Sequence, residues 1–265
     1  MTTPTASKWM LGEELEKTKL AIKANPSDSS LRVTYFQLLC VTADWAKAGD
    51  QLELVESLAP ASALFAQAYY RAIQCELERK EVFDGAQSPV VFGEPEQWLA
   101  GMIDALRLGR SRNWDAASTA QSAAFEAAPV SLGIMNGVPF DWIADGDSRL
   151  GPILEAFIEG KYRWVPFNRI AKIEIAAPRH VVDTIWATAN ITWTNHGVVK
   201  ALIPVRYPGI ERCSGESFLR GTATEWDEKT RGYYLGTGQR ILTSSAEEFG
   251  ILDVREIVFG AKNGA

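Results

Sequence analysis

The tetrapeptide Trp45-Ala46-Lys47-Ala48 has a counterpart 69 residues later in the chain, Trp114-Asp115-Ala116-Ala117. The two share the first tryptophan and the last alanine. Each copy places an alanine 12 positions before a proline, Pro60 in the first copy and Pro129 in the second. Small residues at such a position let two helices pack closely against each other. The recurrence therefore predicts a repeat that is built from pairs of helices.

Four prolines give the length of this repeat. Pro26, Pro60, Pro95 and Pro129 follow one another at intervals of 34, 35 and 34 residues. Tetratricopeptide repeats are helix–turn–helix units of about 34 residues, and a proline suits the end of the second helix because it cannot continue a helix. Residues 1–130 are therefore predicted to form a tetratricopeptide-like helical superhelix.

Apolar residues at helical spacing outline the individual helices. The predicted ranges are 9–24, 31–43, 45–58, 61–79, 97–109 and 114–127. A loop is expected at 85–95, where two prolines and two glycines interrupt the pattern. One unit cannot bury its apolar face alone, so stacked units should build a continuous core. By analogy with such folds, a concave surface that holds a peptide or a helix is expected.

The character of the sequence changes after Pro129, where alanine becomes rarer and glycine, proline and aromatic residues increase. Residues 131–265 are predicted to form a smaller mixed, mainly antiparallel α+β domain. The predicted strands are 170–175, 189–193, 198–205, 233–243 and 251–259, and short helices are expected at 153–159 and 179–186. Strands 189–193 and 198–205 should form a hairpin, because the turn Thr194-Asn195-His196-Gly197 offers asparagine and glycine, which tolerate positive φ.

Composition and charge restrict the class of protein. The 265 residues are 46% hydrophobic and 23% charged, values that are typical of globular domains. The formal net charge is −6, with 12 basic and 17 acidic residues up to residue 130, then 15 and 16 after it. This balance argues against nucleic acid as a partner, because phosphate binding needs a basic face.

Cysteine usage and the apolar pattern suggest the compartment. The three cysteines, Cys40, Cys75 and Cys213, are odd in number and far apart, which predicts buried thiols in a reducing compartment. No apolar run is long enough to span a membrane, and Met1–Lys8 does not resemble a secretory signal. A cytosolic protein without a membrane partner is expected.

The segment 140–152 is the densest polar motif in the chain and contains Gly146-Asp147-Ser148. This triplet is similar to the nucleophile block of Gly-Asp-Ser-Leu esterases, which also carry an Asp-x-x-His pair late in the chain. Here no histidine follows His196, and neither histidine has an aspartate three residues before it. Ser148 therefore lacks a base, and a hydrolase is the weakest of the functional hypotheses.

Asp145 and Asp147 also have the spacing that begins a calcium-binding loop. The next ligand position would be Arg149, and the required glycine would be Leu150. Both residues break the EF-hand rule. A hydrogen-bonded loop that pairs an aspartate with Arg149 explains the motif better.

Two other candidate patterns are incomplete. Gly236-Thr237-Gly238 lacks the third glycine of a dinucleotide fingerprint and the βαβ unit around it. His180 and His196 have no nearby cysteine with which to bind zinc. The sequence therefore predicts no catalytic residue, no cofactor and no metal site, and we expect a protein that is not an enzyme.

Several ordered motifs resemble the ImpE/SciE family, also called TagJ, which are accessory proteins of bacterial type VI secretion. In the second half they are Phe140-Asp141-Trp142-Ile143-Ala144-Asp145-Gly146-Asp147-Ser148-Arg149-Leu150-Gly151-Pro152, Trp164-Val165-Pro166-Phe167, Pro204-Val205-Arg206-Tyr207-Pro208-Gly209, Ala223-Thr224-Glu225-Trp226 and Gly238-Gln239-Arg240. Asn25-Pro26 and Trp45-x-x-Ala48 extend the resemblance into the repeat half. The sequence departs from the family at Arg220-Gly221-Thr222, where a Leu-Gly-Arg-like run is expected, and at Ile210, where serine is commoner.

The resemblance implies a non-enzymatic adaptor in the bacterial cytoplasm. Its implied partner is the N-terminal helical segment of the small subunit of the contractile sheath, with an indirect link to the ATPase that disassembles the sheath. An amphipathic helix in an apolar groove is a common recognition mode. A tetratricopeptide-like adaptor for another secretion or regulatory protein is the alternative hypothesis.

Nine residues of the second half form the candidate site. They are Asp141, Trp142, Asp145, Asp147, Arg149, Arg206, Tyr207, Trp226 and Arg240. We expect them on one face of the second domain, where they either bind the partner or lock the two halves together. The acidic first half should prefer a partner helix with a basic face, and that preference should weaken as salt rises.

Overall fold

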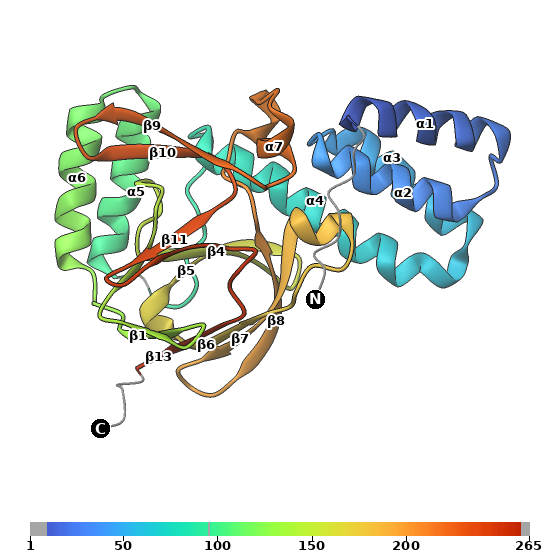
Figure 1. The fold of residues 1–265 in the computed structure, drawn as a ribbon. Helices are drawn as coiled ribbons and strands as arrows, with labels where there is room; N and C mark the ends of the chain where they lie inside the picture. The colour runs from blue at the N-terminus through green and yellow to red at the C-terminus, as the bar shows by residue number, and fades with distance from the viewer. Residues whose placement is uncertain (1–9, 95, 261–265) are drawn as a thin grey trace.

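The computed structural model describes residues 10–94 and 96–260, and it confirms a mixed α+β fold with helices followed by a mainly antiparallel sheet (Figure 1). The helices of the first half are α1 Leu11–Ala24, α2 Ser29–Val41, α3 Trp45–Leu58, α4 Ala63–Phe83, α5 Gln97–Arg110 and α6 Trp114–Ala127. All six predicted helices are present. The predicted start at Trp9, the third proline Pro95 and the segment Met1–Lys8 lie outside the described residues.

The α2–α3 and α5–α6 pairs are built in the same way. Each pair turns on a residue in the left-handed region, Ala43 with φ 56° and Arg112 with φ 58°. The two alanines of the repeated tetrapeptide, Ala48 and Ala117, are both completely buried. The 69-residue recurrence in the sequence is therefore a recurrence of local structure.

The helix pairs do not form one continuous stack. Helices α1–α3 and the start of α4 lie at one end of the molecule, and α5 and α6 pack against each other at the opposite end (Figure 1). The 21-residue helix α4 runs from the first group into the centre. The chain beyond Phe83 does not form a second helix of this unit, because it crosses to β5 as a loop in which Val91 bridges Trp164.

The second half is built around an eight-stranded antiparallel sheet with the order β2-β1-β13-β6-β7-β8-β4-β5. Its strands are β1 Gly133–Met135, β2 Val138–Phe140, β4 Ile153–Ile158, β5 Lys161–Pro166, β6 Ile170–Ile175, β7 Trp186–Trp193, β8 Val198–Pro204 and β13 Glu256–Phe259. A three-stranded sheet joins β3 Ile143–Asp145, β11 Ile241–Ser244 and β12 Glu248–Gly250, and β9 Thr224–Thr230 pairs with β10 Tyr233–Gly238. Short helical turns complete the half: η2 Phe167–Arg169, η3 Val181–Thr184, η4 Ile210–Arg212 and α7 Glu216–Leu219.

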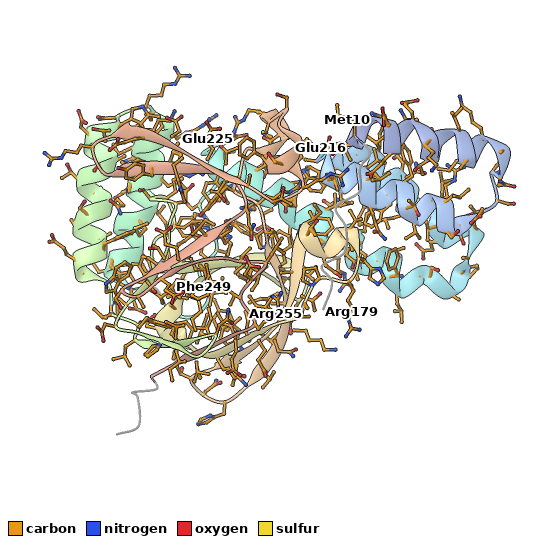
Figure 2. The ribbon with its side chains drawn as sticks, in the orientation of Figure 1. Met10, Arg179, Glu216, Glu225, Phe249 and Arg255 are labelled. Atoms are coloured by element: carbon orange, nitrogen blue, oxygen red, sulfur yellow. The ribbon has the colours of Figure 1, made fainter. Side chains whose placement is uncertain are left out.

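Side chains fill two hydrophobic cores on the two faces of the large sheet (Figure 2). The first core joins helices α1–α6 to one face of the sheet, and the second lies between the other face and the three-stranded sheet. Strand β4 contributes to both, because Ile153 and Phe157 enter the first core while Leu154 and Ile158 enter the second. The helices and the sheet thus share the first core.

The predicted helix at 153–159 is wrong, because these residues form strand β4. All six residues of β4 are buried, so the strand lacks the alternation that marks a half-exposed strand. The predicted helix at 179–186 is reduced to the 3₁₀ turn η3, and β7 begins at Trp186.

Three strand predictions need different boundaries. The predicted hairpin is confirmed as β7 and β8, although His196 with φ 66° takes the left-handed position. The range 233–243 is two strands, β10 and β11, which are separated at Gly238 with φ 92°. In the range 251–259 only β13, from Glu256 onward, is a strand.

Candidate functional site

The nine predicted site residues divide into a buried and an exposed group. Five side chains are buried, namely those of Asp145, Asp147, Arg206, Tyr207 and Arg240, and the side chain of Arg149 is only 15% exposed. Three residues lie at the surface, namely Asp141, Trp142 and Trp226. The structure therefore brings six of the nine into the interior of the protein.

Asp145, at the end of β3, is the first centre of this buried network. Its carboxylate accepts hydrogen bonds from Nη1 of Arg240 at 2.6 Å and from the hydroxyl of Tyr207 at 3.0 Å. Burial raises the pKa of Asp145 to about 6, although the guanidinium of Arg240 favours the charged form. The carboxyl is thus held by two residues whose proximity the motif resemblance suggested.

Glu155, at the middle of β4, is a second centre that sequence reasoning missed. Arg79 of α4 donates to it from Nε at 2.8 Å and from Nη2 at 2.9 Å, and Tyr162 and Arg240 donate as well. Burial favours the neutral acid, but Arg79 and Arg240 outweigh it and lower the pKa of Glu155 to about 2. A single acidic residue in an apolar run was the only available signal, and the helix predicted there obscured it.

Arg79 and Glu76 connect α4 to this network. Besides its bonds with Glu155, Arg79 donates to the carbonyl of Arg206 at 2.8 Å and to Glu76 at 3.3 Å. Glu76 also accepts a 2.8 Å hydrogen bond from the indole of Trp186. The helix is therefore fixed to the β half by a charged side chain that is completely enclosed by protein.

Arg206 contacts the helices of the first half at the end of α2. Its guanidinium donates to the carbonyls of Val41 at 2.6 Å and Cys40 at 2.9 Å, the last two residues of α2, and to that of Leu219 at 2.7 Å. Helix ends leave carbonyls without partners, and a cation is favourable at this end of the helix dipole. Burial lowers the pKa of Arg206 to about 10, so the side chain stays charged near neutral pH.

Asp147 and Ser148 hold the segment 145–151 to strand β10. Asp147 accepts from the backbone amides of Arg149 at 2.9 Å and Gly236 at 2.8 Å, and it pairs with the guanidinium of Arg149. The hydroxyl of Ser148 accepts from the amide of Tyr234 at 2.9 Å. The arrangement is that of a hydrogen-bonded loop, and no group of three or more potential metal ligands is found among the described residues.

The exposed members form a separate feature of the surface. Trp142 is 43% exposed and Trp226 is 38% exposed. The ring of Trp226 packs against Tyr207 with 5.5 Å between the ring centroids, so it covers the buried network from outside. The backbone amide of Asp141 donates to the hydroxyl of Ser245 at 2.7 Å.

A groove of about 460 Å³ lies between α4 and strands β4, β7 and β8, and two further grooves are also large enough to hold part of a partner. The first of these two has a volume of about 410 Å³ and lies between α1 and α2, with an apolar floor that includes Ala21, Leu31, Leu38 and Val181. Its rim carries Glu13, Glu14 and Lys17.

In the part of the chain that the structure covers, no helix is long and apolar enough to cross a membrane.

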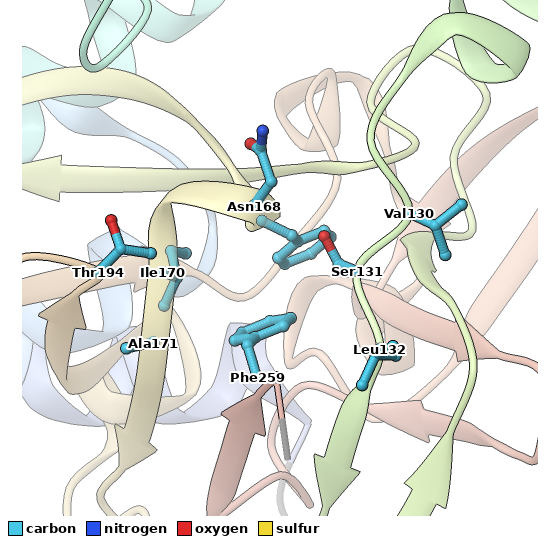
Figure 3. Close-up of a pocket in the computed structure, with 10 residues that line it drawn as sticks. Val130, Ser131, Leu132, Asn168, Ile170, Ala171, Thr194 and Phe259 are labelled. Carbon is cyan, nitrogen blue, oxygen red and sulfur yellow. The ribbon is translucent and has the colours of Figure 1, made fainter. Parts of the chain in front are cut away.

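The second groove, of about 440 Å³, lies at the start of β1 and the end of β13 (Figure 3). Phe167 and Phe259 stack in its wall with their ring centroids 5.7 Å apart. The hydroxyl of Ser131 has no hydrogen-bond partner among the described residues. None of the nine predicted site residues lines either groove.

Comparison with known proteins gives consistent matches. A family model described as "ImpE protein" matches residues 137–258. The chain is 36% identical over 249 residues to the type VI secretion system accessory component TagJ of Pseudomonas aeruginosa, a match that covers 94% of this chain and 87% of that protein. The crystal structure of a Vibrio parahaemolyticus protein matches with a TM-score of 0.86 and 25% identity, and covers 96% of this chain and 95% of that one.

Proposed function

The chain belongs to the ImpE family, and from this premise we propose that it is an accessory protein of type VI secretion that binds the N-terminal helical segment of the small contractile-sheath subunit. The similarity to TagJ over nearly the whole chain supports the accessory role. The same role would give it an indirect link to the ATPase that disassembles the sheath, in the bacterial cytoplasm. The proposal assigns the chain no catalytic step.

The groove between α1 and α2 is the observation that carries the binding mode. An amphipathic helix can place its apolar face on a hydrophobic groove, with its charged residues at the rim. The apolar floor of Ala21, Leu31 and Leu38 suits such a face, and the rim carboxylate of Glu13 suits a basic flank, whereas that of Glu14 already pairs with Arg220. Binding should therefore weaken as the salt concentration rises.

The buried charged residues have a different proposed role. Arg206 donates to carbonyls of α2, and Arg79 of α4 pairs with Glu155 of β4. We propose that Asp145, Asp147, Arg149, Arg206, Tyr207 and Arg240 lock the two halves together, and that Asp141, Trp142 and Trp226 remain available at the surface. Alanine at Asp145 tests this role. Loss of partner binding with an unchanged melting temperature would contradict the locking role.

Calorimetry tests the binding proposal directly. A synthetic peptide of the small sheath subunit's N-terminal segment is titrated into the full chain at two salt concentrations, and micromolar or tighter binding is expected. Ala21→Trp should fill the groove and weaken binding about tenfold or more. Leu20→Trp is the matched control, because Leu20 is the preceding residue of α1 and is 64% exposed.

The outcomes separate the two functional hypotheses. Binding that Ala21→Trp weakens and Leu20→Trp leaves unchanged supports a sheath-binding adaptor that uses this groove. Binding that neither substitution changes would move the contact to another surface. No binding to the peptide or to the intact sheath subunit would favour an adaptor for a different secretion or regulatory protein.

A further inference from the structure

A smaller pocket is lined by residues of α4, α5, α6 and β10. Helices α5 and α6 lie at the opposite end of the molecule from α1 and α2 (Figure 1). The pocket has a volume of about 160 Å³ and is formed where the end of α4, the α5–α6 turn and strand β10 meet. Its apolar wall includes Phe83, Leu106, Trp114 and Leu235. The remainder is dominated by four arginines, namely Arg110, Arg112, Arg149 and Arg212.

The positive charges around this pocket outnumber the carboxylates that pair with them. Arg110 and Arg212 share Asp84, at nitrogen–oxygen distances of 3.6 and 3.9 Å, which are too long for hydrogen bonds. Arg149 pairs with Asp147, and Arg112 forms no ion pair with any described residue. Asp84 also pairs with Lys80, and Arg212 lies 3.9 Å from Glu211 as well. These five cationic groups against the carboxylates of Asp84, Asp147 and Glu211 leave an excess of two positive charges around the pocket.

A buried hydroxyl in the same pocket also lacks a partner. Tyr233 is completely buried, and its hydroxyl makes no hydrogen bond with any described group. Burying a polar group without a hydrogen bond is unfavourable, so native proteins rarely retain one without a reason. Burial raises the pKa of Tyr233 to about 12, and the hydroxyl therefore keeps its proton and can donate near neutral pH.

We propose that this pocket binds a small oxyanion of the phosphate class, held by Arg110, Arg112 and Arg212 and by the hydroxyl of Tyr233. Guanidinium groups match phosphate oxygens in geometry and bind them through paired, charge-assisted hydrogen bonds. A dianion would balance the excess of two positive charges and would give Tyr233 its missing acceptor. The proposal does not depend on sheath binding, because it uses a separate surface of the molecule.

Titration of the full chain with inorganic phosphate tests the proposal. The ionic strength is held constant with chloride, and binding is measured by calorimetry. Arg112→Gln should raise the Kd about tenfold or more, because the phosphate loses the charge-assisted hydrogen bonds of this guanidinium. Tyr233→Phe should raise the Kd severalfold. Arg179→Gln is the control with the same change in charge, since Arg179 is an exposed arginine outside the pocket, and should leave the Kd unchanged.

A second variant tests the pocket without changing its charge. A Cβ at Gly109 would lie 3.3 Å from the oxygen of Tyr233 and 3.3 Å from the ring of Trp114. Gly109 lies within α5, where alanine is a better helix former than glycine, so Gly109→Ala should remain folded. The added methyl group should occupy part of the pocket and weaken phosphate binding.

A parallel titration with O-phosphoserine distinguishes two sources of the same chemistry. Binding of both ligands, lost in Arg112→Gln and retained in Arg179→Gln, would assign the pocket to a phosphate group carried on a larger molecule. Binding of inorganic phosphate alone would assign it to the free anion. No binding of either ligand, or equal weakening in Arg112→Gln and Arg179→Gln, would overturn the proposal.

Discussion

The turn between α2 and α3 and the turn between α5 and α6 have the same local structure in different surroundings. In each, the amide of the residue before the second helix, Asp44 or Asn113, donates at 3.0 Å to a carbonyl five residues earlier. The carbonyls that precede the first turn, those of Cys40 and Val41, also accept from Arg206. A buried cation therefore holds that turn by hydrogen bonds.

No buried cation holds the second turn in this way among the described residues. Gly109 occupies the place of Cys40 at the 69-residue offset. Beside it lies the hydroxyl of Tyr233, which has no partner. The difference teaches that the repeat sequence determines the shape of the turn, whereas residues distant in the chain determine whether it becomes a junction or a candidate pocket.

The largest effect on the free energy of unfolding should come from substitutions of the residues that face the two turns. Arg206→Met should lower the free energy of unfolding by about 3 kcal/mol or more, because three carbonyls lose a charged donor and only that of Cys40 keeps a backbone donor, the amide of Ala43. Tyr233→Phe removes a buried hydroxyl without a partner and should leave the free energy of unfolding unchanged or raise it by up to about 1–3 kcal/mol. Urea denaturation measures both values. Equal losses in the two variants would remove the distinction between the turns.

The next effect concerns pH and the charged network behind the first turn. Burial raises the pKa of Asp145 to about 6, whereas its value in the unfolded chain is about 3.9. Between these values the folded state holds the extra proton, so the free energy of unfolding should rise as pH falls, by on the order of 1 kcal/mol per unit.

The control for this pH effect is Asp145→Asn, which should flatten the dependence between about pH 4 and 6. At lower pH the sign reverses. The guanidiniums of Arg79 and Arg240 hold the pKa of Glu155 at about 2 despite its burial, so its contribution to stability is lost as pH falls toward that value. An unchanged slope in Asp145→Asn, measured by urea denaturation at several pH values, would show that this carboxyl titrates normally.

A smaller effect should separate the two helix caps. The side chain of Asp44 accepts from the amide of Lys47 at 3.3 Å, whereas the side chain of Asn113 makes no capping hydrogen bond. Asp44→Ala should therefore lower the free energy of unfolding by about 1 kcal/mol, and Asn113→Ala by much less. Thermal unfolding of the two variants gives the comparison, and the reverse order would contradict the structural difference between the caps.

The smallest effect concerns the positive-φ residue of each turn. Its replacement by glycine should change stability equally in the two turns but change phosphate binding in only one. Ala43 and Arg112 both have positive φ, so replacement of either by glycine should relieve strain and stabilise the fold by about 0.5 kcal/mol. Only Arg112→Gly should also weaken phosphate binding. Thermal unfolding together with calorimetry checks both parts, and equal phosphate affinity in the two variants would count against the proposed pocket.

The helices were predictable from the sequence because their signals are local. The ranges 45–58 and 114–127 agree with α3 and α6 at both ends. The buried strand β4 was not predictable in this way, because its residues face two cores and show no alternation. Whether a short apolar run forms a helix or a strand depends on partners that lie elsewhere in the chain.

The candidate site was predictable only in part. The motif resemblance brought together Asp145, Tyr207 and Arg240, which the structure joins by hydrogen bonds. It could not identify Arg79 and Glu155, because α4 and β4 meet only in the folded protein. Nor could it show that three of the nine residues are exposed, since burial depends on the packing of all the strands.

The contact between Arg206 and α2 has a consequence for the order of events during synthesis. Arg206 follows Val41 by 165 residues, and ribosomes add roughly 5–20 residues per second. The end of α2 is therefore made on the order of ten seconds or more before the side chain that completes it. Contacts that span so much of the chain slow folding, and we expect the nascent helix stack to stay frayed at this end until Arg206, two residues after β8, has been translated.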